Sequence, residues 1–209
     1  MPATLAYPQV CQMLQAAVGQ IRANHQRLSQ LDAAVGDGDH GTSILRSMEA
    51  VAKAIDETPG TDLKALLAKI AWDVMDSDGG STGPLLGSFF SGMSDALSGQ
   101  TELDCVAMVA MFEGGILKVA QQSRAQVGDK TMMDAFLPAL DALRAAAPAD
   151  GIRSALQQAA QAAALGAEST KPLRAKFGRG RNLGERVIGH VDPGAVSVSL
   201  LFQGFSEVP

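Results

Sequence analysis

The sequence predicts a single all-α domain that spans residues 1–209, and three observations support this fold class. The chain of 209 residues is long enough for one well-buried core. Its apolar residues are mostly Ala, Leu, Val and Met, with only one Trp, one Tyr and seven Phe, which favours helix-on-helix packing over a β-sandwich. These residues recur three, four or seven positions apart in segments that polar, glycine-rich loops separate.

Four helices are expected in the first half of the chain, each with its apolar residues on one face. Pro59-Gly60 ends the second helix, and Thr61 is a suitable N-cap for the third. A glycine-rich break at residues 77–84 separates the third helix from the fourth. The expected apolar faces run through residues 10–31, 44–55, 63–75 and 86–97.

Four further helices are expected in the second half. Thr101 and Asp104 resemble a capping box for the first of them, and Pro138 must kink or restart the second. Asp192 and Pro193 form a good N-cap and N1 pair for the last helix, although VSVSLLF within it also alternates like a strand. The expected ranges are 106–120, 131–147, 152–167 and 193–205.

Composition and charge narrow the class of protein. A net charge of −5 gives no general attraction for nucleic acid or an anionic membrane. Cys11 and Cys105 lie far apart within apolar helical patterns, which favours free thiols over a disulfide. No signal peptide is evident, and no uncharged apolar run approaches the ~18 residues that span a bilayer. We therefore expect a soluble, cytoplasmic protein.

The stretch VGDGDHGTS, residues 35–43, concentrates charge and backbone freedom. Asp32, Asp37 and Asp39 are hard oxygen ligands that repel one another unless a cation or proton compensates them. A bound Mg²⁺ or Ca²⁺ ion offsets that repulsion, so the stretch suggests a site for one of these ions. The spacing does not fit an EF-hand, because position twelve counted from Asp37 is Met48. The structural alternative is that Asp39 only caps the following helix.

A second glycine-rich loop, GGSTG at residues 79–83, offers free backbone N–H groups and two hydroxyls before a helix. This arrangement is typical of anion binding, because N–H donors add to the positive end of a helix dipole. The sequence is neither a Walker A loop nor a Rossmann motif. Such loops are also common as plain hinges, but beside a metal loop it suggests a Mg–phosphate ligand.

A third stretch, GDKTMMD at residues 128–134, allows two interpretations. Asp129 or Thr131 is a suitable cap for the next helix. The functional alternative is that Thr131 and Met132 line a nucleotide pocket, since Met packs well against a flat base.

The fourth stretch, FGRGRNLGER followed by IGHVDPG, lies partly in a segment with six basic residues and one acid, Lys171–Arg186. Arginines between glycines form a basic loop that reaches phosphate oxygens, although a solvated charge run is the usual alternative. Nucleic-acid binding is disfavoured by the acidic total and the lack of aromatic platforms. His40 and His190 both lie in glycine-flanked loops, whereas His25 is expected at the surface.

These four stretches, in this order, resemble the nucleotide-binding L subunit of the dihydroxyacetone kinase family. They are GDGDHG, GGSTGPLLGSFF, GDKTMMDA and GRG-x-x-LGER-x-IGH-x-DPGA, and the similarity covers about residues 30–202. The resemblance implies an antiparallel eight-helix barrel with the nucleotide at one end. It matches Asp32, Asp37 and Asp39 to the three aspartates that hold two Mg²⁺ ions against the nucleotide phosphates.

The resemblance also implies nucleotide contacts. Ser43 stands where the family commonly has Asn, and Ser123 lies in a stretch without the usual glycine. Arg179 is the expected catalytic residue, because it would stabilise charge on the transferred phosphoryl group. The expected contacts with ADP or ATP are His40, Gly41, Thr42, Ser43, Gly80, Ser81, Thr82, Ser123, Met132, Arg179, Asp192, Pro193 and Gly194.

The same resemblance implies partner proteins. In the family, a K subunit holds dihydroxyacetone covalently through its own histidine, and the L subunit supplies the nucleotide. Stand-alone L subunits usually keep ADP bound while a phosphohistidine on an M subunit rephosphorylates it, in a phosphoenolpyruvate–glycerone phosphotransferase. Homodimers and hetero-oligomers with the K subunit are compatible with this role. The alternatives are an ATP-dependent kinase subunit for another small ketose or polyol, and a nucleotide-loaded regulatory interaction module.

Overall fold

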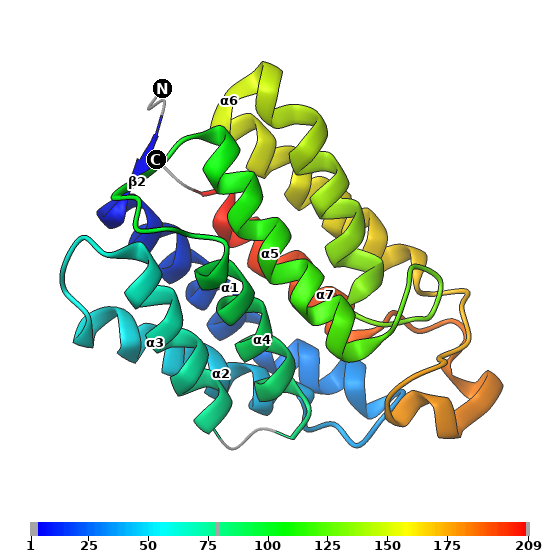
Figure 1. The fold of residues 1–209 in the computed structure, drawn as a ribbon. Coiled ribbons are helices and arrows are strands. Elements are labelled where there is room, and N and C mark those ends of the chain that lie inside the picture. The colour runs from blue at the N-terminus through cyan, green and yellow to red at the C-terminus, as the bar shows by residue number, and fades with distance from the viewer. Residues whose placement is uncertain (1–3, 78–79, 208–209) are drawn as a thin grey trace.

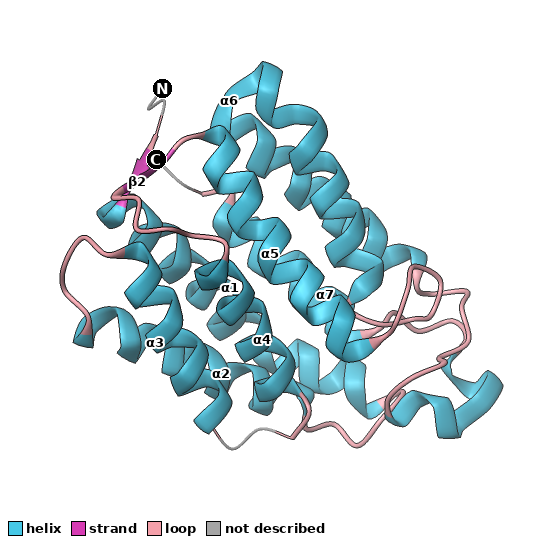
Figure 2. Cartoon of the chain, viewed as in Figure 1, coloured by secondary structure: helices cyan, strands magenta, loops and turns pink. Residues whose placement is uncertain are grey.

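Helices carry almost all of the regular structure in the computed structural model, which describes residues 4–77 and 80–207 (Figure 2). The all-α prediction is therefore confirmed. The helices are α1 (Tyr7–Ala33), α2 (His40–Glu57), α3 (Leu63–Asp76), α4 (Thr82–Asp95), α5 (Cys105–Ser123), α6 (Met133–Ser169), the 3₁₀ helix η1 (Arg179–Val187) and α7 (Pro193–Phe205). The two short strands β1 (Leu5–Ala6) and β2 (Glu102–Leu103) pair antiparallel.

The α-helices close into a ring in which each packs against the next one along the chain. Helix α7 returns to pack against α1, and successive helices run in opposite directions (Figure 1). Helix α6 turns back on itself at Gly151, whose φ of 79° and ψ of 171° are not helical. With the two halves of α6 taken separately, the described residues hold eight α-helical segments, as expected of the antiparallel barrel.

The interior of the barrel is packed with aliphatic side chains and a group of phenylalanines, which are the main aromatic residues of the chain. Their rings contact one another in a chain of tilted and edge-on pairs, with centroids 5.1 Å apart for Phe89 and Phe136 and 5.6 Å apart for Phe112 and Phe202. Six of the seven phenylalanines belong to this buried group: Phe89, Phe90, Phe112, Phe136, Phe202 and Phe205. The scarce aromatic residues therefore serve the helix-packed core.

Two of the predicted helix caps are wrong by one or a few residues. The carboxylate of Asp62, not the hydroxyl of Thr61, caps α3 by accepting from the backbone N–H of Ala65 at 2.9 Å. Asp104 alone caps α5 through the N–H of Ala107. Thr101 takes no part in that cap, because the next two residues form β2 and leave the helical direction.

The expected break at Pro138 does not occur. Pro138 lies in the first two turns of α6, where it removes one hydrogen bond, to the carbonyl of Asp134, without a departure from helical backbone angles. The strand alternative for VSVSLLF is also wrong, because α7 is helical throughout. Met75, Val106 and Leu117, assigned to apolar faces, are 42%, 77% and 41% exposed.

Cys11 and Cys105 are both free and partly buried, as the spacing predicted. Within the described residues, no helix combines the length and apolarity that crossing a membrane requires.

Candidate functional site

Four loops gather at one end of the barrel, the lower right end in Figure 1. They are every second connection of the ring, so the alternation of helix direction brings them together although they are distant in sequence. The loops are residues 34–39, 77–81, 124–132 and 170–192. Residues from all of them border one open cavity of about 820 Å³, large enough for a nucleotide.

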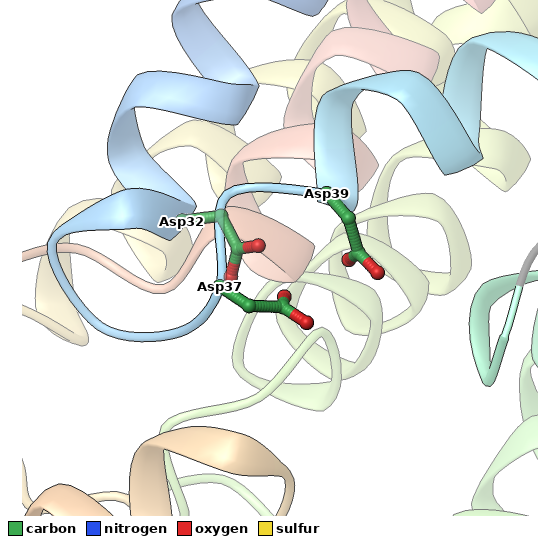
Figure 3. Close-up of side chains that lie close together, drawn as sticks. All are labelled: Asp32, Asp37 and Asp39. Carbon is green, nitrogen blue, oxygen red and sulfur yellow. The ribbon is translucent and has the colours of Figure 1, made fainter.

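The side chains of Asp32, Asp37 and Asp39 lie close together (Figure 3), and Asp32 and Asp39 border this cavity. Asp32 lies in the last turn of α1, Asp37 in the loop and Asp39 at the start of α2. One carboxylate oxygen from each lies within 4.8 Å of the others. Asp32 is only 8% exposed and accepts from the N–H of His40 at 3.2 Å, whereas Asp37 and Asp39 are open to solvent. Converging carboxylate oxygens of this kind fit a hard divalent cation.

The glycines between the aspartates have a steric reason. A Cβ at Gly36 would lie 2.4 Å from Oδ1 of Asp32 and would displace that carboxylate. Gly38 has a φ of +80°, which L side chains rarely adopt. The loop therefore holds its shape only with glycine at these two positions.

The carboxylate of Asp39 does not cap α2. Asp39 occupies the N-cap position, but its side chain accepts no hydrogen bond from the first turn. Its Oδ1 instead accepts from Nη1 of Arg179 at 2.8 Å, and the same Nη1 donates to Asp37. The hydrogen bond from Arg179 holds the pKa of Asp39 below its usual value. The basic loop thus reaches the acidic cluster across 140 residues of sequence.

The residues that follow Asp39 divide into two groups. His40 borders the cavity, and Nε2 of its ring lies 2.8 Å from Oγ of Ser197. Desolvation lowers the pKa of His40, and the charges of Asp32 and Asp39 oppose that shift. Gly41 faces away from the cavity, because a Cβ there would lie 1.9 Å from the carbonyl oxygen of His25. Its role is to let α1 and α2 approach.

The first turn of α4 opens toward the cavity. Gly80, with a φ of +61°, precedes Ser81, whose hydroxyl makes no capping bond to the helix. Ser81 and Thr82 both border the cavity. This end of α4 therefore presents hydroxyls and N–H groups, as an anion site requires. Two residues of the predicted loop, Asp78 and Gly79, lie outside the described residues.

The third loop contains a residue whose part in the site the sequence did not reveal. Lys130 is 2% exposed, has a φ of +59°, and its Nζ donates to the carbonyl oxygens of Thr170, at 2.6 Å, and His190. Asp134 holds the loop in shape by accepting from the N–H of Gly128 at 2.6 Å and of Thr131 at 2.8 Å. A lysine bound to backbone carbonyls has no sequence signature, so only the fold identifies it.

The N-cap position of α6 falls at Met132 and has no side-chain cap, so neither Asp129 nor Thr131 is the N-cap residue that the GDKTMMD stretch suggested. Oγ1 of Thr131 accepts from the N–H of Met133 at 3.2 Å, and Thr131 and Met132 also border the cavity. Asp129 does not cap α6. It accepts from the N–H of Gln126 and pairs with Lys176 at 2.6 Å, and that pair keeps the pKa of Asp129 low.

Asp192 joins the last loop to α7. Its Oδ2 accepts from the N–H of Ala195 at 2.7 Å, as the predicted N-cap should, and its own N–H donates to Oγ1 of Thr170 at 2.8 Å. Desolvation raises the pKa of the Asp192 carboxyl to about 7, and the charge of Lys130 acts in the opposite direction.

Most of the predicted nucleotide contacts meet at the cavity. Gly41, Thr42 and Ser43 are not among the residues that border it. Phe177, Asn182 and Gln122 do border it and were not predicted, because none of them stands out in the sequence. The predicted residues that border the cavity are Asp32, Asp39, His40, Gly80, Ser81, Thr82, Ser123, Met132, Arg179, Asp192, Pro193 and Gly194.

The described residues thus combine an all-α barrel, a cluster of three carboxylates and the first turn of α4 at one end of the molecule. The DAK2 domain family matches residues 34–207, and the chain belongs to this family.

Individual relatives agree with this assignment. The chain is 40% identical over 192 residues, 90% of its own length and 88% of the relative's, to the ADP-binding subunit DhaL of PEP-dependent dihydroxyacetone kinase 2 from Listeria innocua. It is 36% identical to the L-erythrulose 1-kinase of Mycolicibacterium smegmatis, with 88% of this chain and 32% of that one covered.

Among solved structures, the dihydroxyacetone kinase of C. freundii in complex with AMP-PNP and Mg²⁺ matches with a TM-score of 0.75 and 27% identity. That match covers 98% of this chain and 34% of the kinase. The chain thus spans about a third of the longer kinases and nearly the whole of the separate subunit.

Proposed function

We propose that this chain is the nucleotide-holding catalytic subunit of a dihydroxyacetone kinase. It binds Mg²⁺ with ADP or ATP in the 820 Å³ cavity and passes the phosphoryl group to dihydroxyacetone held by a K subunit. The observation that carries the proposal is the convergence of the Asp32–Asp37–Asp39 cluster, Arg179 and the first turn of α4 at that one cavity. The proposed role places the chain in the cytoplasm.

The acidic cluster is the proposed seat of two Mg²⁺ ions. Three carboxylates give it a charge of −3, so two divalent cations leave a net charge of +1 facing the phosphates. Bound Mg²⁺ supplies charge neutralisation on the phosphate oxygens, which is the main requirement of phosphoryl transfer. Asp32 accepts from the N–H of His40, whereas Asp37 and Asp39 are exposed and accept from Arg179, so binding of the ions would exchange those contacts for metal ligation.

The remaining polar groups act on the phosphates themselves. The N–H groups and hydroxyls at Ser81 and Thr82 accept a phosphate at the positive end of α4. Arg179 already lies against the acidic cluster, so its guanidinium is placed to stabilise charge on the group in transfer. The nucleobase is expected against Met132, which offers a polarisable surface to a flat ring.

The names of the relatives support a proposal for the phosphoryl donor. A relative that this chain matches over nearly its full length is named a PEP-dependent ADP-binding subunit, which favours ADP held as a cofactor and rephosphorylated by an M subunit. The similarity to an L-erythrulose 1-kinase supports one alternative, a subunit for another small ketose, because the sugar is chosen by the partner.

Replacement of the two exposed ligands tests the proposal. Asp37→Asn with Asp39→Asn should abolish Mg²⁺-dependent ADP binding in calorimetry and leave the helical circular dichroism spectrum intact. A matched control, Asp56→Asn with Asp141→Asn, removes the same charge from exposed carboxylates elsewhere and should bind normally. Unchanged ADP binding in the first variant overturns the metal assignment.

The native mass of freshly purified protein separates the alternatives. Retained ADP with two Mg²⁺ is expected if ADP is a resident cofactor, and phosphate exchange should then require the partner subunits. An empty protein that turns over added ATP with a K subunit indicates an exchanging kinase. Bound ADP with no phosphate exchange in the presence of K and M subunits indicates a regulatory module instead.

A further inference from the structure

The side chain of Lys130 joins two points of the chain that are 20 residues apart. Its Nζ donates to the carbonyl oxygen of Thr170, where α6 has just ended, and to that of His190, just before α7. The residues between these two carbonyls form the loop that carries Arg179 to the cavity. One buried ammonium group therefore ties together both ends of that loop.

Other hydrogen bonds close the loop at the same place. The N–H of Asp192 donates to Oγ1 of Thr170 at 2.8 Å, and the N–H of Gly189 donates to the carbonyl oxygen of Lys171 at 2.8 Å. We call these contacts, together with those of Lys130 Nζ, the neck. Lys130 is the only member of the neck that comes from outside the segment 170–192, so it anchors the neck to the barrel.

The loop beyond the neck has little support of its own. It contains a 3₁₀ helix, η1, flanked and interrupted by glycines with positive φ, Gly178 and Gly184. Most of η1 is exposed, and Arg179 itself is 58% exposed at the side chain. Among the described residues, the polar contacts of this loop with the barrel are those of Lys176 with Asp129, next to Lys130, and those of Arg179 with the acidic cluster; the buried side chain of Val187 adds an apolar contact. The position of Arg179 thus depends on the neck.

The backbone at Lys130 also points to a specific role. Its φ of +59° is a left-handed conformation that favours glycine, and side chains with a Cβ adopt it at a cost in energy. The loop is held in this shape by Asp134 through Gly128 and Thr131. In this conformation the lysine turns inward, with 2% of its surface exposed, and reaches carbonyls on both ends of the loop.

We propose that Lys130 is a positioning residue that anchors the neck of the 170–192 loop and thereby sets the place of Arg179 against the metal cluster. Its ammonium acts through backbone carbonyls and does not itself need to touch the nucleotide. The consequence for nucleotide binding rests on the proposed function, whereas the anchoring of the loop does not.

Hydrogen exchange of the loop tests the anchoring directly. Lys130→Met keeps the length of the side chain and removes all its donors, and Lys130→Gly removes them while accommodating the positive φ. In both variants the amides of Gly189 and Asp192 should exchange at least about tenfold faster, because local opening of the neck loses its buried hydrogen bonds. Amides in α3 and α4 should keep their rates.

Three further variants serve as controls. Lys171→Met removes an exposed lysine from the same segment and should leave the exchange rates at the neck unchanged. Thr170→Val removes the acceptor for the N–H of Asp192 without touching Lys130, and should speed exchange at Asp192 in the same direction. Lys130→Arg keeps the donors and should restore part of the protection. If Lys130→Met unfolds, Lys130→Gly still decides the question.

Nucleotide binding supplies the second readout. Affinity for Mg–ADP should fall about tenfold in Lys130→Met and recover in part in Lys130→Arg, whereas Lys171→Met should bind as the native protein does. Wild-type exchange at the neck in both Lys130→Met and Lys130→Gly overturns the proposal. If the native protein binds no Mg–ADP, the proposed function fails, and the exchange rates still decide the role of Lys130.

Discussion

The two ends of the barrel are built from the same helices but differ in their backbone. Ten described residues have a positive φ, and eight of them lie in the four loops at the cavity end, including Arg124 and Lys130, which are not glycine. At the opposite end only Gly99 and Gly151 have a positive φ. At that end an Asp side chain caps each of α3 and α5, and the strands β1 and β2 pair with each other.

The difference shows that energetically unfavourable backbone conformations are concentrated at the cavity end of the barrel. A helix packs well with standard backbone angles, so the far end needs only caps and short turns. A site that must aim carboxylates, N–H groups and a guanidinium at one cavity needs backbone shapes that side chains disfavour, and the surrounding fold holds them in place. Substitutions at the two ends should therefore have different consequences.

The largest effect is expected for Gly41→Ala at the cavity end. The added Cβ would lie 1.9 Å from the carbonyl oxygen of His25 and must push α1 and α2 apart, at a cost of about 3 kcal/mol or more. The melting temperature should fall by roughly 10 °C. Gly60→Ala at the far end, where nothing lies within 4 Å of the new Cβ, should change it little. Equal melting temperatures for the two variants would refute the close approach of these helices.

A more selective effect is expected for Gly36→Ala. Its Cβ would lie 2.4 Å from Oδ1 of Asp32, so the carboxylate must turn away from the cluster. Mg²⁺-dependent ADP affinity in calorimetry should fall at least about tenfold, as for the loss of one charged contact, while the melting temperature changes by only a few degrees. Gly19→Ala in α1, which meets nothing within 4 Å, is the control. Normal affinity in Gly36→Ala contradicts the role given to Asp32.

The pH dependence of stability should reveal Asp192. The pKa of Asp192 is raised from 3.8 to about 7 in the folded chain. Between pH 4 and pH 7 the folded chain therefore keeps a proton on this carboxyl that the unfolded chain has released. The contribution of Asp192 to the free energy of unfolding falls as the pH rises through this range. The slope is at most about 1.4 kcal/mol per pH unit. Desolvation is the main cause of the raised pKa; the hydrogen bond from Ala195 and the charge of Lys130 oppose it, and the charges of Asp134 and Asp32 add to it.

Asp192→Asn keeps the acceptor for the N–H of Ala195 and cannot titrate. Without added Mg²⁺ or nucleotide, the melting temperature of this variant minus that of the native protein should grow between pH 4 and pH 7. A constant difference across that range shows that the carboxyl titrates normally.

The smallest effect is expected at the far end. Asp104→Ala removes the cap of α5 and should lower the free energy of unfolding by about 1 kcal/mol. Mg–ADP affinity should not change, because the cap lies at the other end of the helix from Ser123. Urea unfolding and calorimetry on the same sample check both parts, and a loss of affinity would show that the two ends are coupled.

Much of this arrangement is predictable because it is local or periodic. The helix faces follow from apolar spacing, and the four motifs follow from residue types that carry their chemistry with them, such as Asp32, Asp37 and Asp39. Because the motifs fall in alternate loops, an antiparallel barrel brings them to one end. The residue that caps a helix is harder to predict from the sequence. Thr61 and Asp62 are adjacent candidates, and only the path of the folded chain selects Asp62.

The remaining features depend on contacts between distant segments. The sequence places Gly41 next to the site, yet glycine is needed at this position because a Cβ would clash with the carbonyl oxygen of His25. Lys130 binds backbone carbonyls, which every residue has, so no partner can be read from the sequence. Pro138 predicts a kink or restart of the helix, but α6 tolerates the loss of one hydrogen bond near its beginning. The chain turns back at Gly151 instead.

The central claim is that a metal–nucleotide complex binds at one end of the barrel, among all four loops. Paramagnetic broadening of amide NMR signals by Mn²⁺ with ADP tests it most directly. Broadening is expected in residues 35–40, 80–82, 129–132 and 178–180, and residues 58–61 and 98–103 at the far end should be unaffected. Broadening confined to one loop, or present at the far end, would contradict it.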